Sequence, residues 1–107
     1  MFSALLNKIF LLVAAGDWRA SDHGLQRIDE HGIIIGDLLQ RQELGEPIEV
    51  YPDYHAGPCV LVLSTDRSGP VHALWGLATG TERPAVLITA YRPDPTRWNS
   101  DNRTRRT

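Results

Sequence analysis

Apolar residues in the first fifteen positions recur at helical spacing. They are Phe2, Leu5, Leu6, Ile9, Leu12 and Val13. Intervals of three and four residues are typical of an amphipathic helix, and Gly16 can adopt the left-handed conformation that ends helices. We therefore expect a core-packing helix over residues 3–15. The same run has the composition of a signal peptide, but its helical periodicity argues against that interpretation. Because Asp17 follows closely, the run is also too short to span a membrane.

Two further helices are expected before the chain changes character. Ser21 or Asp22 can cap the first turn of a helix over residues 22–31, and Gly32 stands where a closing glycine belongs. A shorter helix should cover residues 36–44.

After Pro47 the pattern becomes that of strands. Segments rich in Val, Ile, Leu and aromatic residues are separated by clusters of turn residues. These segments are residues 48–51, 59–64, 71–77 and 85–91. Connections this short join antiparallel neighbours, because a parallel crossover needs a dozen or more residues. The pattern predicts an α+β fold, with N-terminal helices packed on a four-stranded antiparallel sheet.

Charge divides the chain into an acidic body and a basic end. Residues 1–96 carry one Lys and six Arg against twelve acidic residues, a net charge of −5, whereas residues 97–107 carry four Arg against one Asp. We expect a single domain over residues 1–98 and a basic tail over residues 99–107, loosely ordered unless a partner holds it. The acidic body argues against extended nucleic-acid binding. The tail arginines are expected to contact an acidic partner or RNA.

Composition also bears on compartment and cofactors. The hydrophobic fraction of 42% and the charged fraction of 22% are those of an ordinary soluble domain. Cys59 is the only cysteine and has apolar neighbours, so it should be a buried thiol in a cytoplasmic protein. No Cys-x-x-Cys pair, His-Glu-x-x-His helix or glycine-rich phosphate loop occurs, so we expect neither a metal nor a cofactor. We expect no membrane association.

One short helix gathers groups suited to proton transfer and anion binding. His23, Arg27 and His31 lie four residues apart and therefore share one helical face. A solvated surface, with nearby acidic residues as charge partners, would explain the same stripe. Gly24 argues against a merely solvated surface. A glycine inside a helix costs about 1 kcal/mol relative to Ala, and its presence suggests close approach of a backbone or ligand.

The last two predicted strands contribute further candidates. Strand alternation places the His72 side chain on one face of the sheet and those of Val71 and Ala73 on the other. The apolar face should pack against the helices, so we expect His72 on the face away from them. Tyr91 and Arg92 end the last strand, where they can orient a phosphate or a base. His72 as a partly buried strand residue and Tyr91 as a core aromatic remain open alternatives. For Trp98, packing of the chain end onto the domain is favoured over stacking on a base.

Four segments together resemble the family known as domain of unknown function 4258. They are residues 21–33, 51–52, 70–74 and 88–98. The family pattern is an amphipathic helix, a His-x-x-x-Arg helix before Gly-Ile, a strand containing His, and a closing Thr-x-Tyr-x-Pro strand followed by Trp. The resemblance covers nearly the whole chain, with one departure: His31 stands where the family more often has Arg.

The resemblance implies a fold and a function. The family is grouped with RelE-like toxins, which pack helices on an antiparallel sheet and cleave RNA without metal, and it often occurs beside a zinc-finger antitoxin gene. It therefore implies a type II toxin that is a metal-independent RNA endonuclease, with an antitoxin protein and mRNA as partners. The implied catalytic residues are His23, Arg27, His72 and Tyr91, and the implied substrate-binding residues are Arg92 and Arg97. The alternative, favoured by the acidic body, is a non-catalytic protein-binding module of the same fold.

Overall fold

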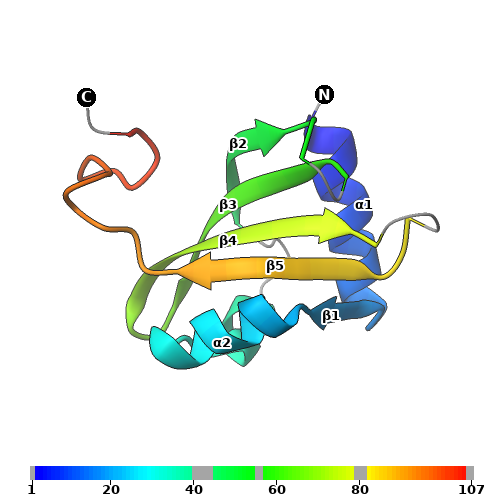
Figure 1. The fold of residues 1–107 in the computed structure, drawn as a ribbon, viewed down its shortest axis with the longest axis horizontal. Coiled ribbons are helices and arrows are strands. Elements are labelled where there is room, and N and C mark those ends of the chain that lie inside the picture. The colour runs from blue at the N-terminus through cyan, green and yellow to red at the C-terminus, as the bar shows by residue number, and fades with distance from the viewer. Residues whose placement is uncertain (1, 40–44, 55–56, 79–81, 106–107) are drawn as a thin grey trace.

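The computed structural model describes residues 2–39, 45–54, 57–78 and 82–105, which form an α+β fold (Figure 1). The elements in chain order are α1 (Phe2–Ala14), β1 (Trp18–Ala20), α2 (Asp22–Glu30), α3 (Ile35–Leu39), β2 (Glu46–Tyr51), β3 (Cys59–Asp66), β4 (Gly69–Leu77) and β5 (Ala85–Tyr91). The class and the order of helices before the main strands are as expected. No helix in the described ranges has the length and apolar character needed to cross a membrane.

The sheet has five strands in the order β1-β5-β4-β3-β2. The four C-terminal strands form the expected antiparallel meander. The prediction of a wholly antiparallel four-stranded sheet is wrong, because β1 adds a fifth strand that pairs in parallel with β5. Three residues are too few to show period-two alternation, and their partner lies far along the chain, so local pattern could not detect β1.

Helix α1 covers one face of the sheet, as its periodicity predicts. Ile9 and Val13 pack against Val60, Ala73 and Trp75 in the main hydrophobic cluster. A smaller cluster of Ile33, Leu38, Val71 and Ala90 closes the core near α3. The opposite side of the sheet, here called the open face, is not covered by a helix of the described residues (Figure 1).

Helix α2 lies along β5 where β1 ends (Figure 1). The Ser21 hydroxyl caps the helix by accepting a hydrogen bond from the Gly24 amide at 2.9 Å, and it donates to the Ile88 carbonyl at 2.8 Å. A Cβ at Gly24 would lie 2.6 Å from the Leu87 carbonyl oxygen, so the expected close approach of another backbone is confirmed. This contact brings the helix face that carries the histidines beside the end of β5.

Several element boundaries differ from expectation. Helix α3 ends at Leu39, and the rest of its predicted range, residues 40–44, lies outside the described residues. Strands β3 and β4 reach Asp66 and Gly69 because they are joined by a tight turn. Cys59 is fully buried as predicted, and burial raises the pKa of its thiol to about 11.

After β5 the chain turns back toward the β2 side of the sheet (Figure 1). We call residues 94–105 the C-terminal segment. Trp98 is only 3% exposed, which confirms that it packs the chain end onto the domain. The loosely ordered tail stays a prediction; within it, Arg103 pairs with Glu46 at 2.6 Å and Arg105 with Glu49 at 2.8 Å. The tail's lack of apolar residues concealed this attachment, which is made by ion pairs.

Candidate functional site

A groove of about 580 Å³ opens between α2, the end of β5 and the C-terminal segment. Most of its charged lining is basic. The histidines and arginines that line it are His23, Arg27, His31, Arg92, Arg97 and Arg105. Asp94 is the one acidic residue among the described residues of the lining, which also includes Thr89, Tyr91 and Trp98. We call this the cationic groove.

The groove brings together five of the six residues predicted for the site, namely His23, Arg27, Tyr91, Arg92 and Arg97. The four-residue stripe of α2 forms one wall. Two of the basic lining residues, His31 and Arg105, were not among the predicted site residues. His31 belongs to the same stripe and could have been included on that ground. No local signal could have placed Arg105, because its position depends on how the C-terminal segment folds back.

His72, the sixth predicted residue, does not line the groove. Its side chain is on the open face as expected, but it is fully buried under the C-terminal segment. The Trp98 ring meets the imidazole edge to face with centroids 4.4 Å apart. The prediction that His72 acts directly on a substrate is therefore not supported by its position, since Trp98 lies over it.

The hydrogen bonds of His72 define its protonation. Nε2 lies 2.7 Å from the Asn102 carbonyl oxygen, and Nδ1 lies 3.3 Å from the Tyr91 hydroxyl. A carbonyl only accepts, so Nε2 carries the proton and Nδ1 accepts from Tyr91 in the neutral ring. Burial lowers the pKa of His72, which favours this neutral form. His72 thus orients the Tyr91 hydroxyl from below the groove.

Tyr91 connects this buried pair to the groove. Its side chain is half-buried, and burial raises the pKa of the phenol. The hydroxyl is therefore protonated at neutral pH. Because its one proton points to His72 Nδ1 in this geometry, the hydroxyl oxygen can accept a hydrogen bond from a ligand and can donate to one only by turning away from His72.

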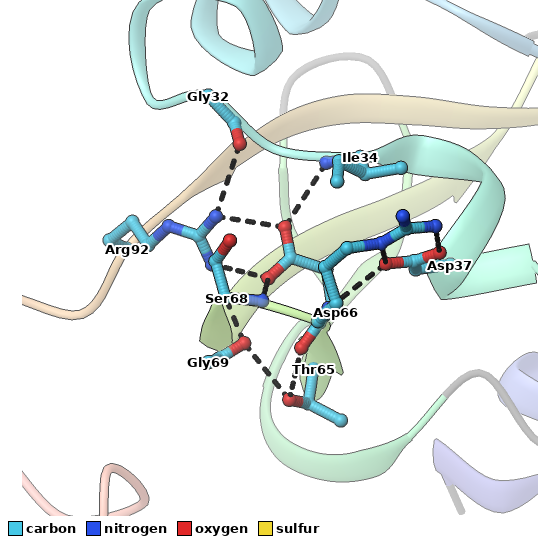
Figure 2. A network of polar contacts seen from close by, with 9 residues as sticks. Gly32, Ile34, Asp37, Thr65, Asp66, Ser68, Gly69 and Arg92 are labelled. Atoms are coloured by element: carbon cyan, nitrogen blue, oxygen red, sulfur yellow. Dashed lines mark hydrogen bonds and ion pairs between the residues drawn. The ribbon is translucent and has the colours of Figure 1, made fainter.

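Arg92 borders the groove but is held in a separate network (Figure 2). Its two terminal nitrogens each lie 2.8 Å from an Asp66 carboxylate oxygen, and one also donates to the Gly32 carbonyl at 3.2 Å. The Asp66 side chain is fully buried and accepts from the backbone amides of Ile34 and Ser68. We call this the Asp66 network.

The Asp66 network changes the interpretation of Arg92. Hydrogen bonds from the Arg92 guanidinium hold the pKa of the Asp66 carboxyl far below its usual range, so both groups are charged and neutralise each other. The contacts join the end of β5 to the β3–β4 turn and the α2–α3 connection. Arg92 accordingly has a structural role in this geometry, although the sequence suggested that it binds substrate.

The remaining arginines differ in how far they are already paired. Arg105 is bidentate to Glu49 and lies over the Trp98 ring at 4.6 Å. Arg27 pairs with Glu30 at 3.3 Å on the exposed surface of α2, an arrangement that contributes little stability. Arg97 has no side-chain ion pair with any residue in the described part of the chain. Arg97 and Arg27 are thus the cations most available to an anion.

Metal ligands do not gather in this region. Across the described ranges, no group of three or more His, Cys, Asp and Glu side chains is placed to hold a metal ion.

Comparison with known families assigns the chain. A family model described as Domain of unknown function (DUF4258) matches residues 20–92, and the chain belongs to this family. The match includes α2 and β5, which supply two walls of the cationic groove, and ends before the C-terminal segment that supplies Arg97 and Arg105. No curated protein sequence and no solved structure matches the chain.

Proposed function

We propose that the protein is the toxin of a type II toxin–antitoxin pair and acts in the cytoplasm as a metal-independent, RelE-like RNA endonuclease. The observation that carries this proposal is the cationic groove. Its lining includes the imidazole of His23, two arginines, Arg27 and Arg97, and the protonated Tyr91 side chain. Its partners are then mRNA and an antitoxin protein of the zinc-finger type.

The chemistry requires a base, an acid and a cation around one phosphodiester. The 2′-hydroxyl attacks the adjacent phosphorus and the 5′-oxygen leaves, which yields a 2′,3′-cyclic phosphate and a 5′-hydroxyl. A base takes the proton of the 2′-hydroxyl and an acid protonates the leaving oxygen. Cations stabilise the added negative charge of the transition state.

The groove offers one residue for each part. His23 serves as the base, since a neutral imidazole has a ring nitrogen that can accept a proton. Tyr91 serves as the acid: its phenol is protonated, and its hydroxyl turns from His72 Nδ1 to the leaving 5′-oxygen to transfer its one proton. Arg97 and Arg27 bind the phosphate. His31 follows His23 by eight residues, or about 12 Å along a helix, so it serves a neighbouring nucleotide rather than the same phosphodiester.

Induced expression and RNA cleavage in the presence of a chelator test the proposal. We expect growth arrest and cleavage by the parent protein. His23→Ala should lower cleavage by about 10² to 10⁴-fold, the usual contribution of one proton-transfer group. Gln26→Ala is the matched control, because Gln26 is exposed on α2 outside the groove and bonds only Glu30 among the described residues. A harmless parent protein, or a His23→Ala variant as active as the parent, contradicts the proposal.

One observation favours the alternative, a non-catalytic protein-binding module. Residues 1–96 carry a net charge of −5, which opposes approach to RNA outside the groove. In that case the cationic groove binds an acidic segment of a partner protein. The alternative predicts that the product of a neighbouring zinc-finger reading frame binds parent and His23→Ala protein equally well, while neither cleaves RNA.

A further inference from the structure

A second hollow lies on the open face of the sheet. It has a volume of about 170 Å³ and is lined by Tyr51, Tyr54, Leu61, Leu74, Thr89 and Tyr91. We call it the tyrosine pocket. Its floor follows the register of three neighbouring strands, in which Leu61 pairs with Leu74 and Leu74 with Thr89. Ala73 and Trp75 pack toward α1, so Leu74 between them points to the open face.

The size and walls of the pocket suit one planar ring. Sites that hold a whole drug-sized ligand measure about 300–1,000 Å³, so this pocket accommodates a single group. The Tyr51 hydroxyl donates a hydrogen bond to the Glu49 carboxylate and accepts one from an Arg105 nitrogen at 3.4 Å. These contacts hold the Tyr51 ring in place, and burial together with the Glu49 contact raises its pKa to about 12. A fixed aromatic wall of this kind is what a stacked ring requires.

The tyrosine pocket adjoins the cationic groove. Thr89 and Tyr91 line both. Arg105 lines the groove and contacts Tyr51 in the pocket wall. An anion in the groove and a ring in the pocket would therefore be neighbours on the same face, as are the phosphate and the base of one nucleotide.

We propose that the tyrosine pocket is a nucleobase subsite, which receives one unpaired base of the RNA strand whose phosphate lies in the cationic groove. This inference rests on the proposed function and adds how the strand is held. Aromatic side chains stack on any base, and the guanidinium groups bind the backbone, which is the usual combination in proteins that bind single strands. The subsite selects unpaired RNA, because a base inside a duplex cannot enter the pocket.

Binding of two matched probes tests the subsite. One probe is a 2′-O-methyl pentanucleotide of mixed base composition, which lacks the nucleophilic hydroxyl and is not cut. The other has the same backbone without bases. The protein should bind the base-bearing probe about 5- to 150-fold more tightly, the fold-change that corresponds to ~1–3 kcal/mol for one stacked base.

Variants then locate the effect. Tyr51→Leu and Tyr54→Leu should lose the preference for bases while affinity for the abasic probe stays unchanged. Tyr51→Phe keeps the ring and should keep the preference, which separates stacking from loss of the hydroxyl. Equal binding of both probes by the parent protein overturns the subsite and leaves the proposed function standing. If neither probe binds, both proposals fail together.

A second measurement covers the case in which the leucine variants do not fold. A 4-thiouridine pentanucleotide is photo-crosslinked to the parent protein, and the modified residues are mapped by mass spectrometry. Crosslinks within residues 51–54 or 89–91 support the subsite. Crosslinks confined to other parts of the chain overturn it.

Discussion

Arg92 and Arg97 both line the cationic groove, yet they stand in opposite environments. Arg92 is bonded to a fully buried carboxylate and to a backbone carbonyl. Arg97 is exposed and forms no ion pair with the described residues. A positive charge beside a groove is available to a ligand only when no buried acid of the protein already neutralises it. Two arginines five positions apart therefore divide the work, one for the fold and one for the ligand.

The largest effect on stability is expected when the buried partner of Arg92, Asp66, is removed. Asp66→Ala leaves the Arg92 charge and two backbone amides without their acceptor. Loss of one partner of a buried ion pair costs about 3–5 kcal/mol, so the free energy of unfolding measured with urea should fall by that amount. Asp37→Ala is the matched control, since its pair with the exposed Arg67 (Figure 2) is worth about 1 kcal/mol or less. Equal losses in both variants would show that the Asp66 network does not support the fold.

The next effect concerns the attachment of the chain end. Deletion of residues 101–107 removes the Asn102 carbonyl that accepts from His72 and the ion pairs of Arg103 and Arg105. A buried donor without a partner costs about 1–3 kcal/mol, so thermal unfolding should occur at a lower temperature. Deletion of residues 106–107 alone keeps every contact described here and serves as the control. An unchanged melting temperature after the longer deletion would confirm the expectation of a loosely ordered tail.

A smaller effect, on RNA binding, is expected when the exposed Arg97 is removed. Arg97→Ala should leave the free energy of unfolding unchanged and weaken binding of the 2′-O-methyl pentanucleotide. The slope of log affinity against log salt should become shallower by about one unit, because one phosphate contact is lost. Arg92→Ala should behave in the opposite way and lose stability first. If Arg92→Ala keeps full stability while its affinity for RNA falls, the division of roles between the two arginines is wrong.

The smallest effect is expected in the pH dependence of stability, where His72 and Asp66 should contribute in different pH ranges. Burial lowers the pKa of His72 in the folded protein, so the unfolded chain binds more protons once the pH falls below about 6.5, and stability declines from there. The pKa of Asp66 is also lowered in the folded protein, chiefly by Arg92, and its contribution is lost only as the pH falls below about 3.9. Melting temperature against pH should thus decline in two stages.

Two variants assign the first of these stages. His72→Gln should remove it, whereas His23→Ala, which changes an exposed histidine, should retain it. A single decline confined to the acid side of pH 4 would show that His72 is not held neutral.

Periodic features of the sequence were sufficient for much of the fold and for part of the site. The three-and-four spacing from Phe2 to Val13 predicted α1, and the apolar segments after Pro47 predicted the antiparallel meander. The stripe of His23, Arg27 and His31 predicted one wall of the groove. In each case a repeat of 3.6 or 2 residues determines which side chains share a face, and that relation is local.

Burial and pairing were decided only by the tertiary structure. His72 and Tyr91 share the open face as strand register requires, but solvent access differs between them because Trp98 folds back over His72. Arg92 meets Asp66 across 26 positions, and Arg105 meets Glu49 across 56. The short strand β1 likewise depends on a distant partner, β5. The spacing of residues along the chain determines which groups can act together, whereas the partner that neutralises a charge or covers a ring comes from a distant part of the chain, where no local period can indicate it.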